Sequence, residues 1–213
     1  VQPNGDVGGG LLECGVGSER VGFGPQLQGC EVYNGSLGVR RLVEDTEDLA
    51  VLGSLVRVTE NFNIVQCLGL ATINGLESLT SVGQMGIMEN PRLTTLEQLG
   101  SLATVEGDLV LVANTNVQAL ELGALLSIGG HFVVEEMDQL RPMDGLDSLR
   151  EVGRLTISDN PALLSLDGLS GLERVRGSLR IVGNRSLSQS QIDEFVSRVV
   201  VDGDVDIREN ASR

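Results

Sequence analysis

The feature that most constrains this chain is a leucine pair that recurs at a nearly fixed interval. Six Leu-x-x-Leu pairs occur, each 23 or 24 residues after the one before: Leu52/Leu55, Leu76/Leu79, Leu99/Leu102, Leu122/Leu125, Leu146/Leu149 and Leu169/Leu172. Self-similarity at such a period indicates a solenoid, in which each unit stacks on its neighbours to bury one continuous core. The interval therefore predicts a repeat protein in place of a compact enzyme domain.

A short alternating segment follows each leucine pair. Its apolar residues are Phe62/Ile64, Met85/Ile87, Leu109/Leu111, Phe132/Val134, Leu155/Ile157 and Leu179/Ile181. Alternation of this kind predicts a short strand with one face turned inward. Too few residues remain between successive strands for a long helix, so we expect a right-handed coil of parallel strands with at most one helical turn near each leucine pair.

An asparagine stands three residues after the last inward strand residue in most units, at Asn90, Asn114, Asn160, Asn184 and Asn210. Asparagine tolerates left-handed backbone, and its amide can bond to backbone groups in a turn. The unit is close to the leucine-rich-repeat pattern, in which Asn or Cys occupies the turn position. Cys67 and Met137 take this position in their units. We therefore predict that Cys67 is a buried structural thiol and not a nucleophile.

The two ends of the chain differ from the repeats, which predicts three segments. Residues 1–29 form a Gly-rich, irregular N-terminal segment and cap, residues 30–187 the repeat solenoid, and residues 188–213 a C-terminal cap. In the last segment, Ile192, Phe195, Val196, Val199 and Val200 follow helical spacing. Ser188 and Gln191 offer a capping box at the start of that helix, and a final strand is expected at 203–207.

Cys14 and Cys30 lie outside the regular repeats. We interpret them as a disulfide that closes the N-terminal end, which would place the protein in an oxidising compartment. The alternative is two free thiols in a cytosolic protein.

Composition narrows the range of partners. Of 213 residues, 41% are hydrophobic but only 2% are aromatic, so the core must be aliphatic. The net charge of −15 disfavours nucleic acid and anionic membrane surfaces and favours a soluble monomer. The chain contains no apolar run of about 18 residues, so we expect no membrane-spanning helix.

Carboxylates are the one residue class that could suggest catalysis. Glu44, Asp45, Glu47 and Asp48 form a run, and Asp202, Asp204 and Asp206 alternate near Arg208. Parallel β-helix enzymes that cleave acidic polysaccharides use clustered acids with Ca²⁺ and a basic residue. We favour the simpler interpretation that these acids face solvent while Val205 and Ile207 face the core.

The remaining motifs indicate no catalytic, cofactor or metal site. The single histidine, His131, lies beside a strand, and one histidine is too few for a histidine-based metal site. The chain has neither a nucleophile elbow nor a phosphate-binding loop. Three Asn-x-Ser sequons, at Asn34, Asn184 and Asn210, are possible glycosylation acceptors, although two of them are already explained as turn residues.

The segment from Gly29 to Val39, with its Cys-x-Val-x-x-Gly-x-Leu-x-Val character, resembles the start of the receptor L domain of the epidermal growth factor and insulin receptor families. The unit from Val152 to Pro161 and the Ile192…Phe195 segment before a Gly-x-Val-x-Ile strand are also similar to that family. The resemblance covers residues 11–210. It implies a right-handed β-helix of leucine-rich-repeat type, with Cys14 and Cys30 as its first disulfide.

These observations lead to one functional expectation. We expect a mainly β, non-catalytic recognition module, extracellular or on a cell surface, that binds a protein or cell-envelope ligand through its solenoid surface. The alternatives are a polysaccharide-active β-helix enzyme that uses clustered carboxylates and a purely structural envelope protein.

Overall fold

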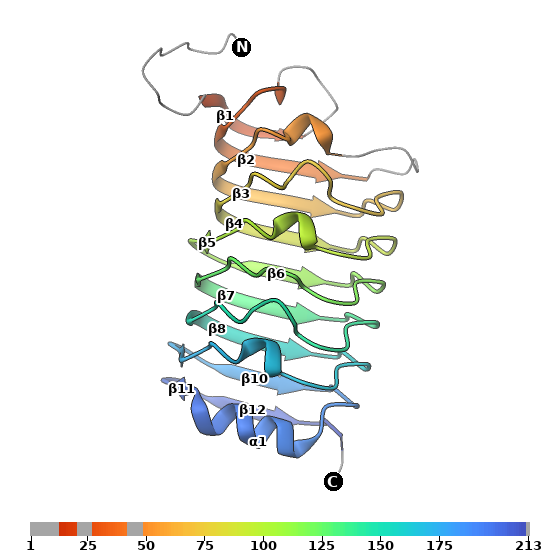
Figure 1. Ribbon diagram of the computed structural model, residues 1–213, viewed down its shortest axis with the longest axis vertical. Coiled ribbons are helices and arrows are strands. Elements are labelled where there is room, and N and C mark those ends of the chain that lie inside the picture. The colour runs from red at the N-terminus through yellow and green to blue at the C-terminus, as the bar shows by residue number, and fades with distance from the viewer. Residues whose placement is uncertain (1–12, 21–26, 42–48, 212–213) are drawn as a thin grey trace.

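The computed structural model describes residues 13–20, 27–41 and 49–211, and for residues 13–20 the backbone alone. These residues form a tall stack of parallel strands with one α-helix at the C-terminal end (Figure 1). The strands are β1 (Glu13–Arg20), β2 (Val32–Arg40), β3 (Arg57–Val65), β4 (Ser81–Met88), β5 (Thr104–Val105), β6 (Leu109–Val112), β7 (Ser127–Glu135), β8 (Glu151–Ser158), β9 (Arg174–Val175), β10 (Leu179–Val182), β11 (Val200–Val201) and β12 (Val205–Arg208). The mainly β, parallel solenoid expected from the repeat is confirmed.

Strand neighbours in space are successive along the chain. The order runs β1-β2-β3-β4-β5-β7-β8-β10-β12, with β6 between β4 and β7, and with β9 paired to β8 and β11. Every one of these described pairings is parallel. Equivalent residues of successive repeats are therefore stacked in columns along the axis of the molecule.

The core consists of several such columns of buried side chains, and one of them runs through the middle of the strands. Inward strand residues pair in register from one repeat to the next, in the series Phe62, Met85, Leu109, Phe132, Leu155 and Leu179. Each of the six is at most 2% exposed. Burying one such side chain contributes about 1.5–3 kcal/mol, so each repeat adds to the stability of the stack through this mostly aliphatic column.

Several strands are longer than the alternating segments predicted. β3 and β4 extend back to include Val58 and Val82, which are also buried. Three residues separate Val58 from Phe62 in β3, whereas two separate Val82 from Met85 in β4, and a register shift between the strands absorbs the difference. A bulge of this kind lets both inward positions face the core despite unequal spacing.

The N-terminal segment departs from the prediction. Residues 1–29 were expected to be irregular, but residues 13–20 form β1, which pairs in parallel with β2 from Glu13↔Val32 to Arg20↔Gly38. The sequence of β1, Glu-Cys-Gly-Val-Gly-Ser-Glu-Arg, lacks the alternation of large apolar residues that identified the later strands, so it gave no strand signal.

The leucine pairs lie on the side of the stack opposite the sheet. Short 3₁₀ turns η2 (Ala50–Leu52), η3 (Glu97–Leu99) and η4 (Asp167–Leu169) occur there, in front of the sheet in Figure 1. The single helical turn expected near the leucine pairs is thus present in three repeats. At Gly75 and Gly145 the backbone instead has a positive φ, of 106° and 85°.

The C-terminal helix α1 (Gln189–Arg198) buries Ile192 and Phe195 against the core, as the spacing predicted. The Ser188 side chain accepts a hydrogen bond from the Gln191 backbone N–H at 3.4 Å. The other half of the capping box is not formed, because the Gln191 side chain accepts from Ser165 instead. The helix also ends earlier than expected, and Val200 continues into strand β11.

Candidate functional site

The turns at the C-terminal ends of β2, β3, β4 and β6 share a special backbone conformation. The residue after each strand, namely Arg41, Gln66, Glu89 or Ala113, has a φ of 55° to 58°. The N–H of each of the four donates to the last strand residue of the following repeat, as in Gln66 N–H to Met88 O at 3.0 Å. This arrangement holds the four residues in one row along the edge of the sheet.

A buried ladder of asparagine side chains, one from each of several repeats, lies directly behind this row. The Asn90 side chain accepts from Cys67 N–H at 3.0 Å and donates to Ile64 O at 3.1 Å, and Asn114 does the same for Asn90 and Ile87. These amides satisfy turn backbones that would otherwise be buried without partners. The turns are therefore fixed from within, and the residues that flank the ladder are held at the surface.

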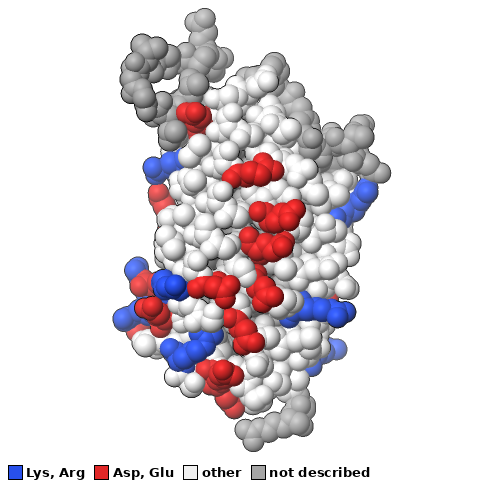
Figure 2. Space-filling view, in the orientation of Figure 1, with Lys and Arg blue, Asp and Glu red and all other residues white. Residues whose placement is uncertain are grey.

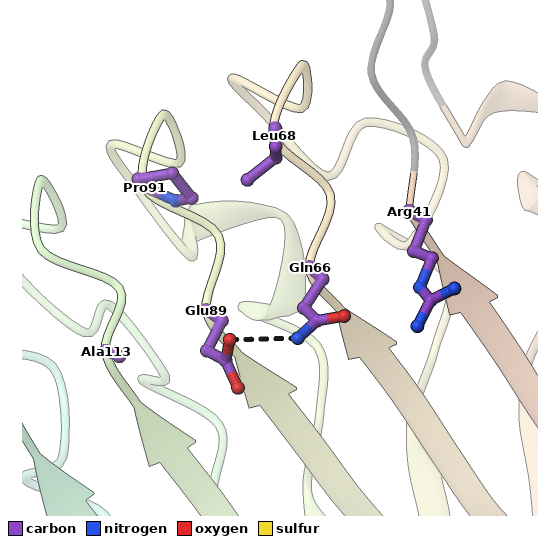
Figure 3. A pocket seen from close by; sticks show the side chains of 6 residues that line it. All are labelled: Arg41, Gln66, Leu68, Glu89, Pro91 and Ala113. Carbon is purple, nitrogen blue, oxygen red and sulfur yellow. Dashed lines mark hydrogen bonds between the residues drawn. The ribbon is translucent and has the colours of Figure 1, made fainter.

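An open groove of about 600 Å³ lies where these turns stand side by side (Figure 3). Six residues from four successive repeats line it: Arg41, Gln66, Leu68, Glu89, Pro91 and Ala113. Leu68 and Pro91 directly follow the ladder residues Cys67 and Asn90, so the turns direct them outward. Leu68 is 52% exposed, so it presents apolar surface to the groove.

The polar side of the groove carries one acid and one base. Gln66 donates from Nε2 to the Glu89 carboxylate at 3.0 Å, as the dashed line in Figure 3 marks. No ion pair of the Arg41 guanidinium occurs among the described residues. The groove therefore offers an apolar wall, an available guanidinium and a hydrogen-bonded carboxylate, a combination that can hold a segment of mixed apolar and polar character.

Sequence reasoning did not identify these groove residues. They share no residue type, because the row that follows the strands contains Arg, Gln, Glu and Ala. The only sequence signal was position, because each residue of this row directly precedes a ladder residue or the equivalent position of its repeat. What makes them a site is the lateral alignment of four turns, which only the stacked structure supplies.

The carboxylates considered as catalytic candidates occupy other places. Asp202 pairs with Arg174 at 2.8 Å, and Asp206 pairs with both Arg180 and Arg208. Asp204 is exposed on the same terminal repeat. Glu44, Asp45, Glu47 and Asp48 lie outside the described residues. Within the described part of the chain, no group of three or more acidic, His or Cys side chains could hold a metal ion.

His131 lies on the outer face of β7. Its backbone N–H donates to the Asp108 carboxylate at 2.7 Å, and its Nε2 is 2.8 Å from Thr156 Oγ1. Burial is the main cause that lowers the pKa of His131 below its ordinary value of 6.5; Asp108 acts in the opposite direction, and Arg154 reinforces the lowering. This environment is that of a hydrogen-bonded surface imidazole within the sheet.

The predicted structural cysteine is buried as expected. Cys67 is fully buried, its thiol donates to Val65 O at 3.5 Å, and its N–H donates to the Asn90 side chain. Cys30 is also buried. The side chain of Cys14 lies outside the described residues, so the Cys14–Cys30 disulfide stays a prediction.

The three sequon asparagines differ in position. Asn184 is fully buried, and its amide nitrogen donates to Ile157 O at 2.9 Å, so glycosylation there would require the ladder to open. Asn210 also donates to a backbone carbonyl, that of Ile181, at 2.9 Å. Asn34 is half-buried in β2. Glycosylation of these residues stays untested.

Comparison with protein-family models, with curated proteins and with solved structures finds no match for this chain. No helix of the described residues is long and apolar enough to cross a membrane.

Proposed function

We propose that this chain is a non-catalytic recognition module, extracellular or on a cell surface, that binds a protein or cell-envelope partner through its solenoid surface. The observation that carries the proposal is the groove at the strand ends, which is lined by exposed Leu68, half-buried Pro91 and Arg41. Within the described residues, side-by-side turns present these groups at an open groove, which is how a preformed binding surface is built.

The finer architecture belongs to the same proposal. We infer right-handed coils of 23 or 24 residues that resemble a receptor L domain. One end would be closed by a Cys14–Cys30 disulfide and the other by α1. Two sequence resemblances support this view: the segment from Gly29 to Val39 and the terminal helix–strand segment.

A peptide-display selection tests the groove. Displayed random 12-residue peptides are selected on the intact protein, and the affinities of the recovered peptides are then measured on Leu68→Glu and Arg41→Glu variants. Because a buried contact at a binding centre is worth 1 kcal/mol or more, each substitution should weaken groove-binding peptides about tenfold.

The matched control is Leu164→Glu, which changes a leucine that is 56% exposed and does not line the groove. Selected peptides should bind this variant as they bind the unmodified protein. Peptides that bind the Leu68 and Arg41 variants undiminished would refute the groove. A polysaccharide hydrolase or lyase activity that is lost on changing Asp204 or Asp206 would refute the non-catalytic proposal.

A further inference from the structure

A second surface, on the side opposite the sheet, carries a row of acidic side chains that we call the acidic face. It consists of Glu77, Glu97, Glu121, Asp144, Asp147 and Asp167, all of them exposed. Figure 2 shows acidic side chains that run down this side of the molecule over most of its height. Because adjacent strands in such a stack are about 4.8 Å apart, successive acids lie close enough to repel one another.

Contacts between repeats confirm that these residues are stacked. The Glu121 N–H donates to Asp144 O at 3.2 Å. A Cβ at Gly168, beside Asp167, would lie 2.7 Å from the Asp144 backbone nitrogen. The Ser170 hydroxyl donates to the Asp147 carboxylate at 3.0 Å. From Glu121 to Asp167 the acids therefore occupy neighbouring positions of successive repeats.

Several acidic side chains on the sheet side of the molecule form ion pairs. There, Glu106, Glu151, Asp202 and Asp206 each pair with an arginine. None of the six carboxylates of the acidic face is in an ion pair among the described residues. Among the described residues, the ion pairs of acidic side chains thus lie on the sheet side, and the acidic face carries unpaired negative charge.

Two arginines lie beside the acidic face and do not neutralise it. Arg150 donates to the backbone carbonyls of Asp147 and Gly171, at 2.8 and 3.1 Å. Arg198 donates to the carbonyls of Leu169 and Ser170. Both guanidinium groups fasten the backbone of neighbouring repeats, so the carboxylates remain available to an external cation.

The part of the acidic face around Glu97 also contains a buried acceptor without a donor. Gln98 is 7% exposed, and its Nε2 donates to the Glu97 carboxylate at 3.1 Å. Its carbonyl oxygen Oε1 is buried and has no hydrogen-bond partner. Thr95, which accepts from Glu97 N–H at 3.1 Å, donates to the Glu121 carboxylate. Glu97 and Glu121 are thus linked through Thr95, and the unsatisfied carbonyl belongs to Gln98, whose amide contacts Glu97.

The chemistry of this cluster fits an organic cation better than a metal ion. The described residues contain no group of three or more acidic, His or Cys side chains that could hold a metal. A guanidinium carries five N–H donors in a fixed fork and can bind a carboxylate through two parallel hydrogen bonds, which leaves further donors for a second acceptor. We propose that the acidic face docks an arginine-rich segment of a partner protein, with one guanidinium bound at Glu97, Glu121 and the Gln98 carbonyl. This surface is separate from the groove, and either can fail without the other.

Fluorescein-labelled nona-arginine is a direct probe. Fluorescence anisotropy should show binding that weakens as sodium chloride rises from 50 to 500 mM, because surface charge is screened by salt. The Glu97→Gln/Glu121→Gln double variant should bind about tenfold more weakly. Gln98→Met should lower the affinity while it raises the melting temperature, because it removes a buried carbonyl that lacks a donor.

The charge-matched control is Glu136→Gln/Glu209→Gln, which removes two exposed carboxylates away from the acidic face. This variant should keep the affinity of the unmodified protein. Equal weakening by both double variants would overturn the proposal, because it would indicate attraction to net charge alone. Displacement of the peptide by 1 mM calcium, with calcium binding lost in the Glu97/Glu121 variant, would also overturn it in favour of a metal site.

Discussion

The side-chain carbonyl of Asn114 accepts two hydrogen bonds from Asn90, one from the backbone N–H at 3.2 Å and one from the side-chain amide at 3.0 Å. The Asn114 amide in turn donates to Ile87 O at 2.8 Å. Each asparagine of the ladder therefore satisfies the repeat before it. The series stops at Met137, whose side chain has no amide, and resumes with Asn160, Asn184 and Asn210.

Asn114→Ala should lower the free energy of unfolding by about 3 kcal/mol or more. The substitution removes three hydrogen bonds and leaves buried groups of Asn90 and Ile87 without partners, at about 1–3 kcal/mol for each unsatisfied group. Urea unfolding followed by circular dichroism would measure the change. Asn116→Ala is the control, because Asn116 is exposed and makes one bond, to Pro91 O. A similar loss in both variants would contradict the structural role of the ladder.

The ladder and the core columns could be predicted because they repeat. Alternation in Phe62/Ile64 and its equivalents identified the inward strand residues, and a fixed offset from them located Asn90 and Asn114. Stacking in register turns a one-dimensional period into a column, so a residue type that recurs at one position has a shared environment.

Features without a recurring residue type could not be predicted in this way. The groove depends on Arg41, Gln66, Glu89 and Ala113, which share a backbone conformation but no side-chain type.

The acidic face could be predicted in part. Glu97, Glu121, Asp144 and Asp167 each follow a buried Leu or Met, so an alignment of the repeats contained that signal. The lack of ion pairs there depends on side-chain positions, which the sequence does not specify.

Ala113→Gly should stabilise the protein by about 0.5–1 kcal/mol. Ala113 has a φ of 55°, a conformation that costs a non-glycine residue about 1–2 kcal/mol, and the greater freedom of glycine in the unfolded chain offsets part of the gain. Gly183→Ala should act in the opposite direction, because Gly183 has a φ of 75° and an added Cβ would lie 2.2 Å from the Asp159 carboxylate. Chemical denaturation of both variants measures the change in the free energy of unfolding. A change of the same sign in both variants would contradict the structure.

Gly168→Ala should destabilise the fold by about 1–3 kcal/mol through overpacking. An added Cβ would lie 1.8 Å from Met143 O in the preceding repeat, and backbone there has no room to move. Gly123→Ala is the matched control, because a Cβ at that position meets nothing within 4 Å. Melting temperatures compare the two variants directly. A Gly123 variant as unstable as the Gly168 variant would show that close packing between repeats is not the cause.

The stability of the protein should fall on acidification partly through His131. Its pKa is lowered in the fold, chiefly by burial, so between that lowered value and 6.5 the unfolded chain binds more protons than the folded one. The free energy of unfolding then rises with pH across this window, and the contribution of His131 is fully present above pH 6.5 and is lost as the pH falls below it. His131→Gln, which keeps a polar group near Thr156, should lose less stability than the unmodified protein between pH 7.5 and pH 5. Subtracting the pH dependence of the variant's free energy of unfolding from that of the unmodified protein removes the effect of the carboxylates, which both proteins share. A constant difference across this range would mean that the imidazole does not titrate differently in the folded and unfolded states.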